Sequence, residues 1–153
     1  MDKIARILDA NLNRGREGLR VIEDLVRFVL DDADLASQMK TIRHEITSLV
    51  RHLPLDELEL LSARDSEGDV GTDISCDSEN LRQDLLQIAI ANIRRSQEAM
   101  RVLEELSKLY DISIASRFKT LRFRIYGLEK EILPRLADLG SPSARRSGYQ
   151  NRK

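Results

Sequence analysis

Apolar residues recur at three- and four-residue spacing along most of the chain, which is the pattern of amphipathic helices. We predict helices over residues 3–30, from the acidic run at 31–34 to residue 52, over 78–110 and over 113–139. Pro54 ends the second of these, and the acidic run supplies its N-cap. The short connections within each pair predict two antiparallel hairpins, packed as an all-α helical bundle.

Two segments of the sequence occur twice. NLNRGREGLRVIED, which begins at Asn11, matches NIRRSQEAMRVLEE, which begins at Asn92, and MKTIR from Met39 matches FKTLR from Phe118. A single helical hairpin cannot bury its own apolar face, whereas two related hairpins packed about a pseudo-twofold axis can. The sequence therefore predicts a bundle of two repeated hairpins with a long connector between them.

Charge is distributed unevenly along the chain. The 26 acidic and 25 basic residues nearly cancel, which disfavours a general nucleic-acid binder. Residues 55–80 nevertheless contain nine acidic residues and one basic one, whereas residues 141–153 contain four basic residues and no acidic one. The predicted organisation is a single helical domain at 1–140, with repeat halves at 3–53 and 78–139 and a loop at 54–77, followed by a disordered basic tail at 141–153.

Few residues suit disulfide or metal chemistry. Cys76 is the only cysteine, and His44 and His52 lie outside any metal-binding motif. No window approaches the roughly 18 consecutive apolar residues of a membrane span, and the sequence shows no signal peptide. We therefore expect a cytoplasmic protein that does not contact membranes or nucleic acid.

Arginine outnumbers lysine 19 to 6, and several of the arginines recur in both halves. Arginine is the side chain best suited to bidentate recognition of phosphate or carboxylate. The repeated polar residues are Asn11, Arg14, Glu17, Arg20 and Glu23, which are matched by Asn92, Arg95, Glu98, Arg101 and Glu104. Helical geometry places Asn11 and Asn92 within the apolar stripes of their helices and places the first arginine of each set on the flank of the stripe.

We predict an anion-binding crevice between the two hairpins. Its edges would be formed by Arg14, Arg95, Arg43 and Arg122. Gly15 and Gly18 would allow two helices to approach closely beside it. The alternative is a polar layer that only fixes the register of the helices. Arg20 and Arg101 project away from the crevice, and their spacing from Glu residues predicts surface ion ladders, unless a second copy of the chain completes the site there.

The segment from Arg64 to Thr72 is a second candidate site. Gly68 and Gly71 permit turns whose backbone N–H groups bind phosphate oxygens. Arg64 would bind a phosphate, and Asp65 and Asp69 have the hard oxygen ligands that Mg²⁺ prefers. The alternative is a solvated acidic connector with no ligand.

The combination of these segments resembles a small all-helical family of hydroxymethylpyrimidine phosphate kinases. RILDANLNRGREGLRVIED, ARDSEGDVGTDI, NIRRSQEAMRVLEELSKLYD and FKTLRFRIYGLEKEI carry the resemblance, which covers about residues 4–135. Domains of this family occur alone or fused ahead of thiamine-phosphate synthase, and the chain resembles the standalone form. The resemblance implies a phosphomethylpyrimidine kinase that transfers the ATP γ-phosphoryl to 4-amino-5-hydroxymethyl-2-methylpyrimidine phosphate for thiamine biosynthesis.

The chemistry implied by the resemblance suggests a role for each candidate residue, with ATP and Mg²⁺ as cofactors. A phosphate monoester is already a nucleophilic dianion near pH 7, so the protein would mainly neutralise and align two anions. The predicted phosphate-binding catalytic residues are Arg14, Arg95, Arg43 and Arg122, the predicted metal ligands are Asp65 and Asp69, and the predicted substrate-binding residues are Asn11, Asn92, Glu17, Glu98, Arg64, Gly71, Thr72 and Lys119. Lys40 is a weaker candidate.

Two other functions stay open from the sequence. One is an all-helical mutase or lyase of the chorismate mutase kind, which would use arginines to bind a dicarboxylate without a metal. The other is a non-catalytic helical module that docks on thiamine-phosphate synthase. The glycine-containing loop with Asp65 and Asp69 favours the kinase, because neither alternative needs a metal-binding loop.

Overall fold

A computed structural model describes residues 2–74 and 81–140, and within these ranges all regular structure is helical. The elements are α1 (Asp2–Phe28), α2 (Ala33–Val50), α3 (Glu57–Ser62), α5 (Leu85–Ser107) and α6 (Ile112–Leu139). The prediction of an all-α bundle is therefore confirmed. No helix in the described part of the chain is both long and apolar enough to span a membrane.

Two details of the predicted helices are wrong: where the third long helix begins, and the absence of a helix from the predicted loop. The third long helix begins at Leu85 rather than at 78, because the Asp84 carboxylate accepts a hydrogen bond from the backbone N–H of Gln87 and caps the helix there. Residue 78 itself lies outside the described residues. The stretch predicted as a loop at 54–77 contains α3, which starts with a capping box in which Asp56 and Glu59 each bond the other's backbone N–H, at 2.8 and 2.7 Å.

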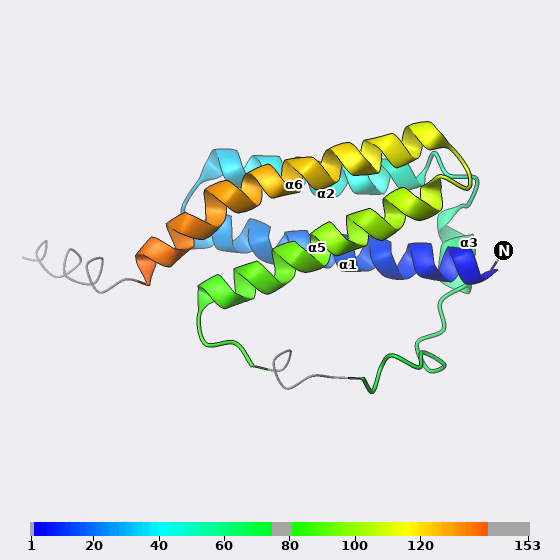
Figure 1. Cartoon of the computed structure of the whole chain (residues 1–153), viewed down its shortest axis with the longest axis horizontal. Coiled ribbons are helices and arrows are strands. Elements are labelled where there is room, and N and C mark those ends of the chain that lie inside the picture. The colour runs from blue at the N-terminus through cyan, green and yellow to red at the C-terminus, as the bar shows by residue number, and fades with distance from the viewer. Residues whose placement is uncertain (1, 75–80, 141–153) are drawn as a thin grey trace, which may run out of the picture.

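The long helices form two layers. Helix α1 packs along α2 and α5, α5 packs along α6, and α2 meets α6 over a shorter contact. Figure 1 shows α2 and α6 on one side of the α1–α5 pair and the described parts of the connector between α3 and α5 on the other side. One surface of the α1–α5 pair therefore faces the connector instead of another long helix.

The core lies between the two layers and consists of aliphatic side chains with one aromatic ring. Ile22, Ile42, Ile93, Phe118 and Ile125 are fully buried. Complete burial of a side chain of this size contributes roughly 1.5–3 kcal/mol to folding. Each hairpin supplies part of this core, as expected if neither hairpin buries its apolar face alone.

Helices α1 and α5 cross at very short range, as the small residues predicted. A Cβ atom added to Gly15 would lie 2.6 Å from Met100 Cε, and one added to Gly18 would overlap Ser96 Oγ and lie 2.6 Å from the backbone oxygen of Asn92. The Ser96 hydroxyl donates a hydrogen bond to the backbone oxygen of Gly15 at 3.2 Å. Gly15 and Ser96 are equivalent positions of the repeat, so this contact joins matching points of the two halves.

Candidate functional site

A hollow lies on the outer side of the α1–α5 crossing, on the side of the pair that faces the connector. Its volume is about 620 Å³, within the range of roughly 300–1,000 Å³ that is typical of small-molecule sites. It is lined by Glu17, Gly18 and Val21 of α1, by Ala91, Asn92, Arg94, Arg95 and Glu98 of α5, and by Arg82 of the connector. The close crossing at Gly18 brings the polar residues of the two helices within reach of one ligand.

Four of the predicted site residues meet in this hollow: Glu17, Asn92, Arg95 and Glu98. Sequence reasoning missed Arg94 and Arg82. The position equivalent to Arg94 in the first half is Asn13, so the repeat gave no signal for it. Its position directly before Arg95 was the signal that could have found it, because neighbouring arginines of one helix can reach the same surface hollow.

The charges in the hollow are largely uncompensated. Arg94, Arg95 and Glu98 are exposed and form no hydrogen bond or ion pair with the described residues. Arg94 and Arg95 thus share the lining with Glu17 and Glu98, so the hollow carries both signs of charge. A guanidinium without a carboxylate partner is free to bind an anionic group of a ligand.

The two repeated asparagines make the same local contact. The side-chain amide of Asn92 donates to the backbone oxygen of Ile88, and that of Asn11 donates to the backbone oxygen of Ile7, both at 2.9 Å. These bonds satisfy the amide donor inside its own helix. The side-chain oxygen of Asn92 accepts no hydrogen bond from the described residues and is available in the hollow.

Arg43 and Arg122 do not line the hollow, so the predicted crevice edged by four arginines is wrong. Arg43 binds Glu23 through Nε and Nη2, both at 2.9 Å, and Arg122 binds Glu104 through Nε at 3.2 Å and Nη2 at 2.9 Å. Glu23 and Glu104 are only 6% and 5% exposed. A buried carboxylate needs such a partner, because it would otherwise be desolvated without compensation. Hydrogen bonds to the Tyr126 hydroxyl and to Glu104 raise the pKa of Arg122.

Arg20 and Arg101 complete these two clusters from the outer surface. Arg101 Nη1 binds Glu104 at 2.9 Å, and Arg20 Nη1 lies 4.0 Å from Glu23. The predicted ion pairs of Arg20 with Glu23 and of Arg101 with Glu104 are therefore present. Both glutamates are buried, however, whereas the prediction placed these pairs on the surface. These clusters join neighbouring helices, which is the polar layer considered as the alternative from the sequence.

Arg64 is occupied by a carboxylate of the fold. Its Nε and Nη2 atoms donate to the two carboxylate oxygens of Asp9, each at 2.8 Å. These hydrogen bonds and the Asp9 charge, with a smaller effect from the Glu17 charge, raise the pKa of Arg64. Arg64 therefore links the connector to α1 rather than presenting an unpaired fork for phosphate.

The predicted metal ligands form turns of the connector. Asp65 Oδ1 accepts from the backbone N–H of Gly68 at 2.8 Å, and Asp69 Oδ1 accepts from that of Gly71 at 2.9 Å. The described residues contain no group of three or more acidic, His or Cys side chains arranged to hold a metal. Asp65 and Asp69 thus belong to no such group, and their role as metal ligands stays a prediction.

The remaining predicted residues lie apart from the hollow. Gly71 and Thr72 are exposed on the connector, Lys119 is exposed on α6, and Arg14 is exposed on α1 without lining the hollow. Their ligand-binding roles stay predictions.

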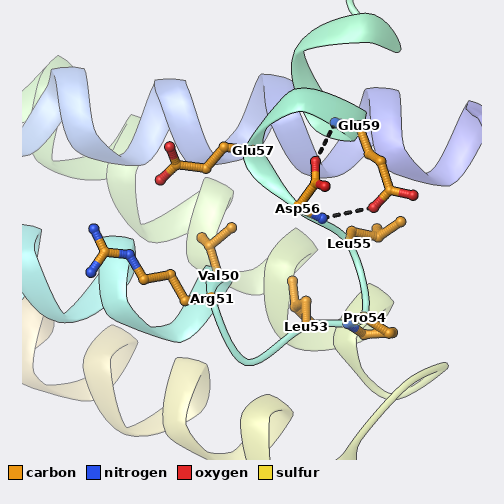
Figure 2. Close-up of a pocket in the computed structure, with 8 residues that line it drawn as sticks. All are labelled: Val50, Arg51, Leu53, Pro54, Leu55, Asp56, Glu57 and Glu59. Carbon is orange, nitrogen blue, oxygen red and sulfur yellow. Dashed lines mark hydrogen bonds between the residues drawn. The ribbon is translucent and has the colours of Figure 1, made fainter.

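A second hollow of about 510 Å³ lies at the corner between α2 and α3. Figure 2 shows Val50, Leu53 and Leu55 on its apolar side and the Asp56 and Glu59 carboxylates engaged in the α3 capping box. The charges left for a ligand are those of Arg51 and Glu57. Because it contains no repeated polar residue, and because two of its three acidic residues are used by the capping box, this corner is the weaker candidate site.

Comparison with known proteins identifies the family. The ThiD2 family matches residues 6–131. The chain belongs to this family. A thiamine-phosphate synthase of Synechocystis sp. is 45% identical over 130 residues, which is 85% of this chain and 36% of the relative, and one of Rhodopirellula baltica is 38% identical over 140 residues, which is 92% of this chain and 37% of the relative. No solved structure matches the chain.

The ThiD2 chain spans about a third of the length of the curated relatives it matches. Its family and relatives place it in thiamine biosynthesis, as the resemblance predicted. The prediction of a phosphomethylpyrimidine kinase is corrected, because the relatives are named thiamine-phosphate synthase, which is a different enzyme. The alternative of a helical module that accompanies thiamine-phosphate synthase agrees better with these names.

Proposed function

We propose that this ThiD2 chain is a helical partner module of thiamine-phosphate synthase that binds the phosphorylated pyrimidine of thiamine biosynthesis in the α1–α5 hollow. The observation that carries the proposal is that Arg94 and Arg95 lie without a carboxylate partner at the crossing of two helices, in a chain whose relatives are thiamine-phosphate synthases.

The lining suits both ends of an aminopyrimidine phosphate. Arg94 and Arg95 provide two neighbouring guanidinium groups for a phosphate that is a dianion near pH 7. Glu98 and the side-chain oxygen of Asn92 accept hydrogen bonds and would pair with the exocyclic amino group. A ligand with a phosphate at one end and amino N–H donors at the other therefore matches the mixed charge of the hollow better than a dicarboxylate does.

Calorimetric titration with hydroxymethylpyrimidine phosphate tests the proposal. We expect binding of the phosphate and much weaker binding of the unphosphorylated alcohol, which would leave the arginines unpaired. Arg95→Ala should weaken binding about tenfold, since a charge-assisted hydrogen bond contributes about 1.5–3 kcal/mol. Arg51→Ala is the matched control, because Arg51 is also an exposed arginine without a described partner and lines the second hollow. Equal affinity for phosphate and alcohol would reject the proposal.

The partner role has a separate test. The chain should comigrate in size-exclusion chromatography with the part of the Synechocystis relative that the match does not cover. Comigration supports a physical module of the synthase, and independent elution rejects that role. Titration with Mg-ATP, with Asp65→Asn and Asp69→Asn as variants, tests the ATP and Mg²⁺ predictions independently of both.

A further inference from the structure

Two ion pairs fasten the connector to α1 where it leaves α3. Besides the two 2.8 Å hydrogen bonds from Arg64 to Asp9, Arg6 Nη2 donates to the backbone oxygen of Asp65 at 2.9 Å. Arg6 Nη1 also lies 3.8 Å from the Asp65 carboxylate. Two consecutive connector residues are thus held on one helix.

The Asp9–Arg64 pair differs from an ordinary surface ion pair. The Asp9 side chain is only 11% exposed, whereas the Arg64 side chain is 45% exposed. Without Arg64 the Asp9 carboxylate would keep little hydration and no cationic partner. The Asp9 carboxylate of α1 therefore favours the state in which Arg64, and with it the connector, is bound to α1.

The second half of the repeat has no counterpart of this pair. Ile90 occupies the position equivalent to Asp9, yet α5 and α6 pack as closely as α1 and α2 do. The second hairpin thus folds without an ion pair at this position. The Asp9–Arg64 pair therefore holds the connector in place and is not needed to pack the two helices of a hairpin.

One end of the connector meets the α1–α5 hollow, and the other end is held on a helix that lines it. Arg82, just before α5, lines the hollow directly. At the other end Arg64 and Asp65 are bound to α1, which supplies Glu17, Gly18 and Val21 of the lining. Figure 1 shows the described parts of the connector passing along the same side of the α1–α5 pair.

We propose that the Asp9–Arg64 and Arg6–Asp65 pairs form a latch that positions the connector against the α1–α5 hollow, so that affinity for the phosphorylated ligand depends on it. Arg64 is then a positioning residue rather than a phosphate ligand. This inference rests on the proposed function for the ligand, but the attachment itself can be measured without one.

The double variant Asp9→Asn/Arg64→Met separates positioning from folding. It removes both charges together, so no buried carboxylate is left unpaired, while the hydrogen bonds of the latch are lost. We expect cleavage by glutamyl endopeptidase after the exposed Glu67 to rise about tenfold, because the connector opens more often. The Kd for hydroxymethylpyrimidine phosphate should rise about tenfold through lost preorganisation.

Asp32→Asn/Arg135→Met is the matched control. Arg135 Nη1 donates to Asp32 at 2.7 Å across two helices, and neither residue lines the hollow. This control should change neither Glu67 cleavage nor ligand affinity. The conservative variant Arg64→Lys, which keeps the charge but not the fork, should recover part of both effects.

The outcomes distinguish the latch from the ligand site. Wild-type cleavage of Glu67 in the Asp9→Asn/Arg64→Met variant overturns the latch, whether or not a ligand binds. Faster cleavage with unchanged affinity overturns its coupling to the hollow and leaves the proposed function intact. Failure of the wild-type chain to bind the phosphate overturns the proposed function and the coupling together, while cleavage still decides whether the latch exists.

Discussion

The two halves of the repeat share most polar contacts within their helices and differ in a few others. Glu23 with Arg43 and Glu104 with Arg122 join the two helices of each hairpin in the same way, through a buried carboxylate. Another contact between the helices of each hairpin has diverged. Arg16 reaches Thr47 at 3.4 Å in the first half, whereas the equivalent Gln97 donates to Glu129 at 2.7 Å in the second.

This comparison separates scaffold from site. The glutamate clusters present in both halves join neighbouring helices, whereas the two asparagines bond within their own helices. Features present in one half only, such as the Asp9–Arg64 ion pair and Arg94 in the hollow, lie where the connector and the candidate ligand site are. The candidate site therefore combines repeated residues with residues that only one half contains.

The largest expected effect comes from a shared contact. Glu104→Gln should lower the free energy of unfolding by about 3 kcal/mol, because it leaves Arg122, and on its outer side Arg101, without their carboxylate. Glu23→Gln should have a smaller effect, since Arg20 is 4.0 Å from Glu23 whereas Arg101 is 2.9 Å from Glu104. Urea unfolding measures both, with the exposed Glu105→Gln as control. Equal losses in all three would show that the buried clusters carry no special weight.

The helix crossing should be next in size. Gly18→Ala should destabilise the fold by about 1–3 kcal/mol, because the added methyl group would overlap Ser96 Oγ and the backbone of α5. Gly127→Ala is the matched control in α6, where a Cβ meets no atom within 4 Å. It should stabilise the fold by roughly 0.5–1 kcal/mol through helix propensity. Thermal unfolding of both variants checks the opposite signs, and a stabilised Gly18→Ala would contradict the close crossing.

Two equivalent arginines should differ in ligand binding. Arg14 and Arg95 occupy the same position of the repeat, but only Arg95 lines the hollow. Arg95→Ala should therefore weaken binding of hydroxymethylpyrimidine phosphate about tenfold, and Arg14→Ala less than about threefold. Calorimetry on the two variants checks this. Equal losses would mean that the ligand lies on the pseudo-twofold axis and contacts both halves.

The smallest effect concerns acid stability. Asp32 and Asp111 cap α2 and α6 at equivalent positions. The hydrogen bond from the Leu35 backbone N–H, with that from Arg135, lowers the pKa of Asp32, and hydrogen bonds from Ser113 lower the pKa of Asp111. Their stabilising contribution is thus present above the unfolded pKa of about 3.9 and is lost as pH falls through the lower folded value.

Asp32→Asn should accordingly flatten the fall in Tm between about pH 4 and pH 2, because Asn retains the cap without titrating. The same holds for Asp111→Asn. Unfolding curves across this range measure the effect. An unchanged slope in the double variant would show that other carboxylates control acid unfolding.

The helical periodicity and the repeat were enough to predict the bundle, the two hairpins and the close approach at Gly15 and Gly18. They could not show that α3 forms, because a helix of only six residues leaves little periodic signal. Helix-face geometry placed Arg43 at the edge of an apolar stripe correctly. It could not reveal that a buried glutamate of the neighbouring helix already binds this arginine, since that depends on the packing distance between helices.

Four of the nine residues that line the candidate site were predicted as site residues. Glu17, Asn92, Arg95 and Glu98 were found because they repeat, whereas Arg94 has no repeated partner. Arg64 was selected for its side-chain chemistry, but its carboxylate partner Asp9 lies 55 residues away in sequence and becomes a neighbour only when the connector folds back on α1.

The most direct test is to map the ligand by NMR. Titration of the isotope-labelled chain with hydroxymethylpyrimidine phosphate should shift backbone amide signals of Gly18 and of residues 91–98, at the α1–α5 crossing. Signals of residues 51–59, at the second hollow, should stay unchanged. Shifts confined to residues 51–59, or no shifts at millimolar ligand, would contradict a phosphate-binding site at the α1–α5 crossing.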